Sequence, residues 1–221
     1  MLFFLYYLDM SSSKINVAKQ AIDYIKDKLH PKMILGIGTG STVNFFIEEL
    51  GAYKNLFAGA VSSSEASSNL LNEKGIEVFN LNDVMDIAYY IDGADEVSPN
   101  YELIKGGGGA HTREKIVASA SNEFLCIVDE TKLVSQLGAF PLPVEVLPES
   151  RSLVARKIVS MGGTPIYRNG FITDQGNEIL DVKDLDISNP EAIEALLNNI
   201  PGVVDNGIFA FNKPKKVLVS S

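Results

Sequence analysis

The 221-residue sequence has few of the side chains that build disulfides and zinc sites. It contains one cysteine, Cys126, and two histidines, His30 and His111, far apart in the sequence. A single cysteine excludes an intrachain disulfide, and the chain offers too few thiolate and imidazole ligands for a zinc-type cluster. The apolar neighbours of Cys126 predict a buried strand residue, because free cysteine packs as a small hydrophobe. A chain without disulfides fits a reducing compartment, and we expect a cytoplasmic protein.

Basic residues are also scarce. The 19 Lys and Arg face 28 Asp and Glu, which gives a net charge of −9. Nucleic-acid-binding proteins normally carry a basic surplus or stripe, so we expect no nucleic-acid partner. The apolar segment 1–8 has no positive region ahead of it and is too short to span a bilayer, so we expect neither a signal peptide nor a membrane partner. An upstream start codon or an accessory segment is expected there, with Met10 as the alternative start.

What is present is a globular composition in which apolar runs, polar or glycine-rich loops and amphipathic stretches alternate. Residues 14–29 carry apolar positions at helical spacing, with serines before them as caps. The same periodicity and the short apolar runs predict strands at 33–35, 58–61, 76–79, 87–91 and 124–128 and helices at 43–50, 65–74 and 112–122. This alternation predicts a parallel sheet with helices on both faces, in which ligands bind beyond the carboxyl ends of the strands.

The alternation of predicted strands and helices changes after Pro141 and Pro143. Asn169-Gly170 predicts a hairpin, and the surrounding pattern predicts strands at 144–147, 165–168, 171–173 and 178–182 and helices at 152–161 and 190–199. We expect residues 216–219 to return as an edge strand. The fold class is therefore α/β, with a Rossmann-like parallel-sheet domain formed by 1–137 and 208–221 and a smaller α+β domain, 138–207, inserted near the C-terminus.

A glycine loop at 36–42 follows the first predicted strand. Ser41 stands where the dinucleotide fingerprint has its last glycine, and the loop lacks the Gly-Lys-Ser/Thr of a P-loop, so neither an NAD-dependent dehydrogenase nor an ATP site is favoured. Two interpretations stay open. The backbone amides, the helix dipole and the hydroxyls of Thr39, Ser41 and Thr42 bind a phosphate, or the loop is a tight turn with Ser41 as a plain helix cap.

Three carboxylates lie close together in segment 92–96, Asp-Gly-Ala-Asp-Glu. Their mutual repulsion needs an offset, and three interpretations provide one. The segment is a solvated turn, a metal site, or a group of acceptors for sugar hydroxyls.

Four consecutive glycines follow Lys105, and such a run has a large entropy cost unless backbone amides must approach a ligand. Lys105 is either a surface cation or a stabiliser of a developing oxyanion. Glu114 lies in the first turn of a predicted helix, where it either complements the helix dipole or acts as a general base. Arg113 and Lys115 are interpreted as solvated or as salt-bridge partners, and His111 as incidental.

Together these segments resemble the type A ribose-5-phosphate isomerase family. From about Ser11 onward the resemblance covers nearly the whole chain, through the segments 36–42, 61–67, 92–96, 105–110, 112–115, 140–146 and 200–204. It implies an aldose–ketose isomerase that interconverts D-ribose 5-phosphate and D-ribulose 5-phosphate in the non-oxidative pentose phosphate pathway, as a homodimer or homotetramer. The implied partner is a phosphosugar, with neither a metal nor an organic cofactor.

The resemblance also implies roles for individual residues. Glu114 is the base that moves a proton between C2 and C1 through an enediolate, and Asp92, Asp95 and Lys105 contact the reacting end. The implied substrate-binding residues are Thr39, Gly40, Ser41, Thr42, Asp92, Gly93, Ala94, Asp95, Lys105, Gly106, Gly107, Gly108 and Lys132.

The sequence departs from the family pattern at three places. Gly109 extends a run that in many members ends in alanine, and His111 stands where an apolar residue is common. The family's N-terminal lysine near the phosphate has no sure counterpart, and Lys19 is the nearest candidate. A non-catalytic sugar-phosphate sensor is the alternative function, although the chain has no spare length for a DNA-binding or output domain. Ligand binding without turnover would identify it.

Overall fold

The structure is a computed structural model that describes the backbone of residues 2–220 and the side chains of residues 12–220. The side chains of segment 1–9, where an accessory segment is expected, lie outside the described residues. The chain divides into two compact units: unit 1 comprises 1–93, 116–132 and 214–221, and unit 2 comprises 94–115 and 133–213. The domain boundaries expected at 138 and 207 stay a prediction, since the units group residues 94–115 with the second body.

Unit 1 contains a five-stranded parallel sheet in the order β12-β6-β3-β1-β2. Its strands are β1 (Ile34–Ile37), β2 (Gly59–Ser62), β3 (Ile87–Asp92), β6 (Ser121–Asp129) and β12 (Lys216–Ser220). The predicted parallel sheet and its returning edge strand are confirmed. Because β1 lies between β3 and β2, the strand order reverses there, and such switch points are where open sheets bind ligands. The strand predicted at 76–79 is wrong, since Val78 forms only an isolated bridge to Ala60.

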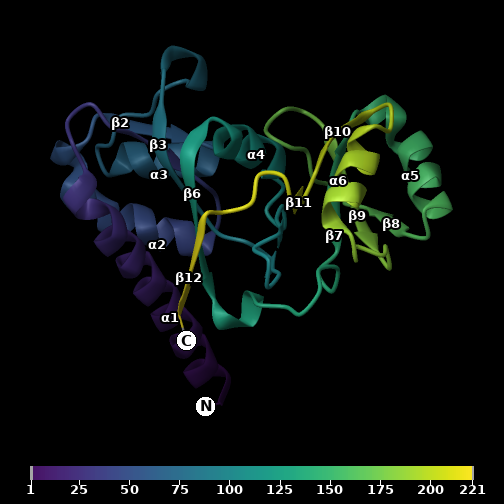
Figure 1. The fold of residues 1–221 in the computed structure, drawn as a ribbon, viewed down its shortest axis with the longest axis horizontal. Coiled ribbons are helices and arrows are strands. Elements are labelled where there is room, and N and C mark those ends of the chain that lie inside the picture. The colour runs from purple at the N-terminus through teal and green to yellow at the C-terminus, as the bar shows by residue number, and fades with distance from the viewer. Residues whose placement is uncertain (1, 221) are drawn as a thin grey trace. The chain divides into compact units, whose positions relative to one another are not determined.

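Helices α1 (Leu2–Ile25) and α2 (Ser41–Leu50) pack against each other, and α1 also contacts β6 and β12 (Figure 1). The serines predicted to cap the first helix lie within α1 instead, because the helix begins well before them. One layer of the core, which these two helices share with the sheet, includes Val17, Ala21, Ile25, Leu35, Ile37, Phe46, Ile47, Ile91, Leu125 and Ile127. The alternate residues Gly36 and Tyr90 point to the other side, where Val117 and Phe124 pack.

The remaining elements of unit 1 are short. They are α3 (Glu65–Glu73), the end of α4 (His111–Ser119), and the 3-10 turns η1 (Lys26–Lys28), η2 (Gly51–Leu56), η3 (Leu81–Asp83) and η4 (Glu130–Lys132). Cys126 is fully buried in β6, as predicted. Within the described residues, no helix combines the length and the apolar character that crossing a bilayer requires.

Unit 2 contains two antiparallel sheets. The larger one has the order β10-β7-β9-β8, from β7 (Leu142–Val146), β8 (Thr164–Tyr167), β9 (Glu178–Lys183) and β10 (Val203–Asn206). The smaller one, β11-β5-β4, joins β4 (Glu96–Val97), β5 (Leu103–Ile104) and β11 (Ile208–Phe209). The helices are the first turn of α4, α5 (Arg151–Ser160), α6 (Pro190–Asn198) and the 3-10 turn η5 (Pro148–Ser150).

A second hydrophobic core, which includes Ile104, Val144, Val146, Ile158, Leu180, Leu197 and Ile208, holds these elements together. The strand predicted at 171–173 is wrong, since these residues pair with no strand that the structure describes; Ile172 is exposed, and the Thr173 hydroxyl donates to the buried carboxylate of Glu145. Strands β8 and β9 still pair, but through a longer connection than the two-residue turn that Asn169-Gly170 predicted. The α/β class with a smaller α+β part is confirmed.

Candidate active site

The loop after β1 lies directly against the end of β3. A methyl group added at Gly38 would lie 2.0 Å from the carboxyl carbon of Asp92, so only glycine leaves room for that carboxylate. The amides of Thr39 and Gly93 donate to Oδ1 of Asp92 over 3.0 and 2.7 Å, and the Tyr90 hydroxyl donates to Oδ2. These donors fix a fully buried carboxylate at the carboxyl end of the sheet.

Helix α2 begins without a side-chain cap. Its N-cap is Gly40, whose φ of 121° is in the region that favours glycine, and Ser41 is the first helical residue. The interpretation of Ser41 as a plain helix cap is therefore wrong. A side chain at Gly40 would meet nothing within 4 Å, and Ser41 is exposed, so this helix N-terminus opens outward. Uncapped amides at a helix N-terminus favour an anion.

Three serines of segment 61–67 support this loop from behind. Ser67 donates from Oγ to the Gly38 carbonyl over 2.7 Å, and the Ser63 hydroxyl lies 2.9 Å from that of Thr39. Ser64 caps α3 by accepting from the Ser67 amide. The serine segment therefore holds the glycine loop in place, a role that the sequence pattern alone did not indicate.

Lys14, and not Lys19, lies beside this loop. Its Nζ donates to the Ser41 hydroxyl over 2.9 Å, whereas Lys19 pairs with Glu49 at 3.9 Å, near the opposite end of α2. Lys19 as the counterpart of the family's N-terminal lysine is thus wrong. Lys132, the other predicted cation, ends η4 directly after β6 and is half-buried.

The acidic segment 92–96 is not a solvated turn, because Asp92 and Glu96 are buried and only Asp95 is half-exposed. Glu96 accepts from the amides of Gly138 and Phe140, and Asp95 accepts from the Gly107 amide over 2.8 Å. The unit boundary falls between Gly93 and Ala94. Across the side chains described from residue 12 to residue 220, no three acidic, histidine or cysteine groups gather as a metal site would require.

Lys105 and Glu114 form a buried ion pair within unit 2. Lys105 Nζ lies 3.0 Å from Glu114 Oε2, and the two side chains are only 3% and 4% exposed. Lys105 is therefore not a surface cation. Glu114 does lie in the first turn of α4, so a dipole interaction and a chemical role are compatible. Because two buried charges have a large desolvation cost, a pair of this kind is a candidate for catalysis.

The neighbours of Glu114 on α4 are both salt-bridge partners. Arg113 pairs with Asp174 at 3.2 Å. Lys115 is buried, lies 3.0 Å from Glu194 and 2.8 Å from Asp205, and donates to the Asn206 carbonyl. Burial raises the pKa of Asp205, and the ammonium of Lys115 opposes that shift. This network fixes the first turn of α4 within unit 2.

A further buried carboxylate holds the start of α4. Glu145 is fully buried and accepts from the hydroxyls of Thr112 and Thr173 and from the side-chain amide of Asn177. All three donors are uncharged, so the network replaces the water that the carboxylate loses on burial. Sequence reasoning missed this role of Glu145, although the residue lies inside the matched segment 140–146.

Three of the four consecutive glycines leave no room for a side chain. A methyl group at Gly106 would lie 2.7 Å from Nδ1 of His111, one at Gly107 would lie 2.8 Å from Asp95, and one at Gly109 would lie 2.3 Å from the Phe171 ring. Gly106 and Gly109 also have φ values of 103° and 80°. Gly108 meets nothing within 4 Å and is exposed. The run is thus packed against other side chains at three glycines, while Gly107 and Gly108 are exposed to solvent.

His111 is fully buried beneath Gly106, so it belongs to the packing of the glycine run. Among the described residues, no group makes a well-formed hydrogen bond to either ring nitrogen. Burial lowers the pKa of His111 to about 3, repulsion from Lys115, Arg168 and Lys105 adds to that effect, and the backbone of Asp205 counteracts it. The imidazole is therefore neutral at pH 7.

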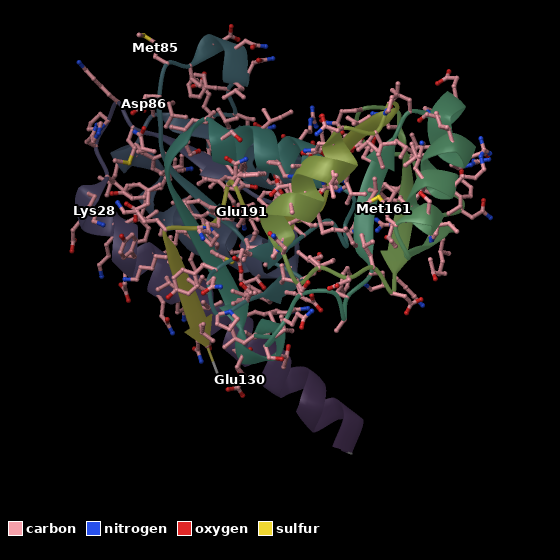
Figure 2. The ribbon with its side chains drawn as sticks, turned by 45° about the vertical axis from the view of Figure 1, so that its right-hand side comes forward. Lys28, Met85, Asp86, Glu130, Met161 and Glu191 are labelled. Atoms are coloured by element: carbon pink, nitrogen blue, oxygen red, sulfur yellow. The ribbon has the colours of Figure 1, made fainter. Side chains whose placement is uncertain are left out.

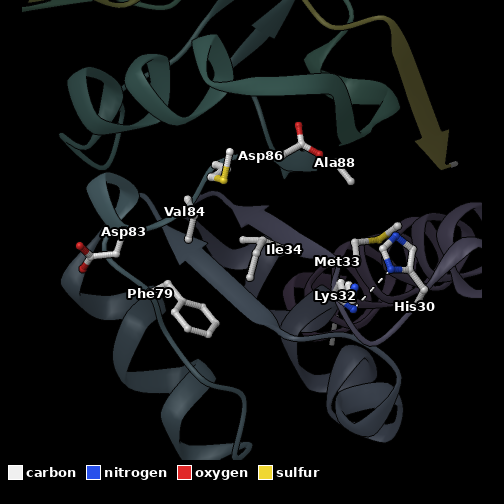
Figure 3. Close-up of a pocket in the computed structure, with 10 residues that line it drawn as sticks. His30, Lys32, Met33, Ile34, Phe79, Asp83, Val84, Asp86 and Ala88 are labelled. Carbon is white, nitrogen blue, oxygen red and sulfur yellow. Dashed lines mark hydrogen bonds between the residues drawn. The ribbon is translucent and has the colours of Figure 1, made fainter.

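A pocket of about 290 Å³ lies at the other edge of the unit 1 sheet (Figure 3). Ile34 and Ala88 line it at the amino ends of β1 and β3, together with Phe79. Met85 borders it on a loop where the side chain is fully exposed, and Figure 2 shows it projecting away from the fold. The predicted residues of unit 1 lie at the carboxyl ends of the strands instead, where parallel sheets bind ligands.

Comparison with known proteins gives one consistent family. The family model described as "Ribose 5-phosphate isomerase A (phosphoriboisomerase A)" matches residues 59–221. A "Ribose-5-phosphate isomerase A" of Legionella pneumophila (strain Lens) is 58% identical over 212 residues, 96% of each chain. The crystal structure of ribose 5 phosphate isomerase A from Neisseria gonorrhoeae has a TM-score of 0.92 at 48% identity, over 96% of this chain and 93% of that one.

A D-ribose-5-phosphate isomerase solved in complex with phospho-erythronic acid has a TM-score of 0.88 at 37% identity, over 96% of this chain and 94% of that one. The relatives thus match nearly the whole chain in sequence and in fold. The chain belongs to the ribose 5-phosphate isomerase A family.

Proposed function

We propose that the protein is an aldose–ketose isomerase that interconverts D-ribose 5-phosphate and D-ribulose 5-phosphate. Membership of the isomerase family supports this activity. The observation that carries the chemical part is the buried ion pair of Lys105 and Glu114 at 3.0 Å. It provides a carboxylate that can accept a proton beside a cation that can stabilise the resulting negative charge.

In the proposed reaction Glu114 removes the proton from C2 of the open-chain aldose. The electron pair of that bond forms the C1=C2 double bond of an enediolate, and the π pair of the C1 carbonyl moves to O1. The proton of the C2 hydroxyl passes to O1, the C2–O bond becomes the ketone carbonyl, and Glu114 returns its proton to C1, which leaves the ketose. A proton next to a carbonyl is weakly acidic, so the oxygens need stabilisation as the base acts. We assign this to Lys105, with Asp92 and Asp95 as hydrogen-bonding partners of the reacting end.

We assign the substrate phosphate to the loop of residues 39–42. The uncapped N-terminus of α2 and the exposed Ser41 support this role. Lys14, 2.9 Å from the Ser41 hydroxyl, supplies the nearest cation, and Lys132 is assigned to the same group. The solved relative that holds phospho-erythronic acid binds a phosphorylated ligand, which is consistent with a phosphosugar substrate here. The amides of Gly106, Gly107 and Gly108 are assigned to the sugar, with Gly93 and Ala94 beside the reacting carboxylates.

We further propose that this reaction serves the non-oxidative pentose phosphate pathway in the cytoplasm, and that the protein acts as a homodimer or homotetramer. The family supports the pathway. Size-exclusion chromatography with light scattering separates the two assemblies from a 24.0 kDa monomer.

The test is an isomerase assay with ribose 5-phosphate in the presence of EDTA, comparing the wild type with Glu114→Gln. The amide cannot accept the proton, so we expect kcat to fall at least about 100- to 1000-fold while the ligand still binds. Glu191→Gln is the matched control, since Glu191 is an exposed carboxylate in the first turn of α6 (Figure 2). Turnover of Glu114→Gln at the wild-type rate would refute the role of Glu114. Binding without turnover in the wild type would indicate the sensor instead.

A further inference from the structure

Arg168, at the end of strand β8, donates to two carbonyls of the glycine run. Its Nη1 lies 3.3 Å from the Gly106 oxygen and 3.2 Å from the Gly107 oxygen, and its Nη2 lies 3.3 Å from the Gly106 oxygen. Arg168 is separated from these glycines by about 60 residues of sequence, and all three residues belong to unit 2. A guanidinium with a fixed fork of donors is suited to holding two neighbouring carbonyls at once.

The guanidinium is itself held in place. Asp181 on β9 accepts from Nε over 2.8 Å and from Nη2, so the pair is bidentate. The backbone amide of Arg168 donates to the Ile179 carbonyl, and the Phe171 ring lies with its centroid 5.3 Å from the guanidinium carbon. The Arg168 and Asp181 side chains are 18% and 23% exposed. A bidentate pair that is largely shielded from water has a defined geometry, unlike most surface ion pairs.

One peptide group connects Arg168 to Asp95. The carbonyl of Gly106 and the amide of Gly107 belong to the same planar peptide bond, and they point in opposite directions because that bond is trans. Arg168 holds the carbonyl, and the amide donates to Oδ2 of Asp95 over 2.8 Å. Glycines on both sides give this peptide unusual rotational freedom, so its orientation depends on what holds its carbonyl. The Gly109 amide also donates to the Gly106 carbonyl over 2.9 Å, and Arg168 adds the contacts from outside the run. When Arg168 fixes the carbonyl, the amide must point at Asp95.

We propose that Arg168 is a positioning residue of the isomerase, which orients the peptide group between Gly106 and Gly107 and thereby fixes the carboxylate of Asp95. This inference rests on the proposed function, because the role of Asp95 comes from it. The cation also polarises the peptide, which strengthens the amide as a donor to the carboxylate. Loss of Arg168 would leave the chemical groups present but Asp95 misplaced.

Arg151 provides a matched control within the same unit. It forms an ion pair with Glu178 at 3.0 Å, and its guanidinium carbon lies 4.3 Å from the centroid of the Tyr167 ring. Like Arg168, it thus has a carboxylate and a ring as partners. Within the described residues, its hydrogen bonds and ion pairs go to Glu178 and not to the glycine run. Replacing either arginine removes one ion pair and one ring contact, but only Arg168→Met also removes the guanidinium from the carbonyls of Gly106 and Gly107.

The experiment measures kcat, KM and the unfolding midpoint for Arg168→Met, Arg168→Lys and Arg151→Met. For Arg168→Met we expect kcat to fall about 30-fold with KM changed less than about threefold, since a displaced catalytic group slows the chemical step. Arg168→Lys should recover little, because an ammonium cannot reproduce the fork. Arg151→Met should stay within about twofold of the wild type in kcat. Equal losses in the two methionine variants would overturn the proposal.

A double-mutant cycle with Asp95→Asn tests the route through Asp95. If Arg168 acts through that carboxylate, Arg168→Met should reduce kcat less than about threefold further in the Asp95→Asn background. A full further 30-fold loss would show that Arg168 acts elsewhere.

The Gly107 amide gives a readout that does not depend on activity. In the wild type this amide donates to Asp95, so its hydrogen exchange should be slowed, and the protection should be lost in Arg168→Met but persist in Arg151→Met. A wild type without turnover that still shows this pattern would refute the proposed function alone. Unchanged protection of the Gly107 amide in Arg168→Met would refute the role of Arg168 whatever the activity.

Discussion

The two glycine loops of this protein differ in how far the rest of the chain encloses them. The loop around Gly40 is open, since a side chain there would meet nothing within 4 Å and the adjacent Ser41 is exposed. The run at 106–109 is more enclosed, because His111, Asp95 and Phe171 leave no room for a side chain at three of its glycines, although Gly107 and Gly108 are exposed to solvent. Both use glycine to let other groups approach the backbone. At Gly40 the space beside the backbone is open, whereas at Gly106, Gly107 and Gly109 it is filled by other side chains.

The charges near the two loops follow the same division. Lys14 is half-exposed beside the open loop, where a flexible ammonium can adjust to an anion. Lys105 and Glu114 are buried near the enclosed run, where water cannot screen them and their geometry is fixed. A phosphate needs affinity, while proton transfer needs groups that are oriented beforehand. We therefore expect substitutions at enclosed or tightly packed positions to reduce activity or stability more than substitutions at open positions.

The largest effect is expected at Gly38, which is the tightly packed glycine of the loop that contains Gly40. In Gly38→Ala the new methyl group would overlap the Asp92 carboxylate, so either the loop or the carboxylate must move. We expect a stability loss of about 3 kcal/mol and a fall in kcat/KM of about 100-fold or more. Urea unfolding and the isomerase assay measure the two effects.

Gly51→Ala is the control for this substitution. Gly51 has a helical φ of −54°, and its nearest contact for an added methyl group is a Lys74 side-chain atom at 3.5 Å. We expect Gly51→Ala to be neutral or slightly stabilising. A Gly38→Ala protein as active and stable as Gly51→Ala would contradict the close contact between Gly38 and Asp92.

A smaller effect on stability, confined to acidic pH, is expected at His111, whose ring packs against Gly106 of the enclosed run. The pKa of this imidazole is lowered to about 3 in the folded protein, against about 6.5 when it is unfolded. Below pH 6.5 the unfolded state therefore binds a proton that the folded state refuses, and stability falls as the pH falls toward 3. Relative to His111→Leu, the wild type should lose about 2 kcal/mol of unfolding free energy between pH 7 and pH 5.

Urea unfolding at a series of pH values measures this difference directly. The carboxylates titrate in both proteins, so their contribution cancels in the comparison. If the unfolding free energies of the wild type and His111→Leu depend on pH in the same way, the imidazole takes up its proton as readily in the folded state as in the unfolded state. The account of its burial would then be wrong.

The smallest effect is expected at the open loop. Lys14→Met removes the cation beside Ser41, and we expect KM for ribose 5-phosphate to rise about tenfold with kcat nearly unchanged. Lys19→Met is the matched control, because its partner Glu49 lies away from the loop and the pair is exposed. A KM effect of Lys19→Met equal to that of Lys14→Met would return the phosphate contact to Lys19.

Local patterns were sufficient to predict most of the fold. The alternation of apolar runs and amphipathic stretches located β1, α2, β3 and β6, because each of them buries a face that its own sequence defines. The two-residue strands β4, β5 and β11 could not be found this way, since they have no period and exist only through pairing in the folded chain. The strand expected at 76–79 failed for a related reason: its apolar residues pack without extended pairing.

The candidate site was predictable where its residues lie in one segment. Lys105 and Glu114 flank a glycine run that is unusual by itself, and the structure pairs them. Lys14 could not be separated from Lys19 by spacing, because that choice depends on which face of α1 meets the loop. Arg168 lies about 60 residues from the glycines that it contacts, and nothing in its own neighbourhood marks it.

The contact between Gly109 and Phe171 ties two distant positions of the chain to each other. A methyl group at Gly109 would lie 2.3 Å from the Phe171 ring, and the ring also lies beside the guanidinium of Arg168. A protein of this family that carries alanine at the matching position therefore needs a smaller side chain in place of the phenylalanine. We therefore expect the residue types at positions 109 and 171 to change together in the family and not one at a time.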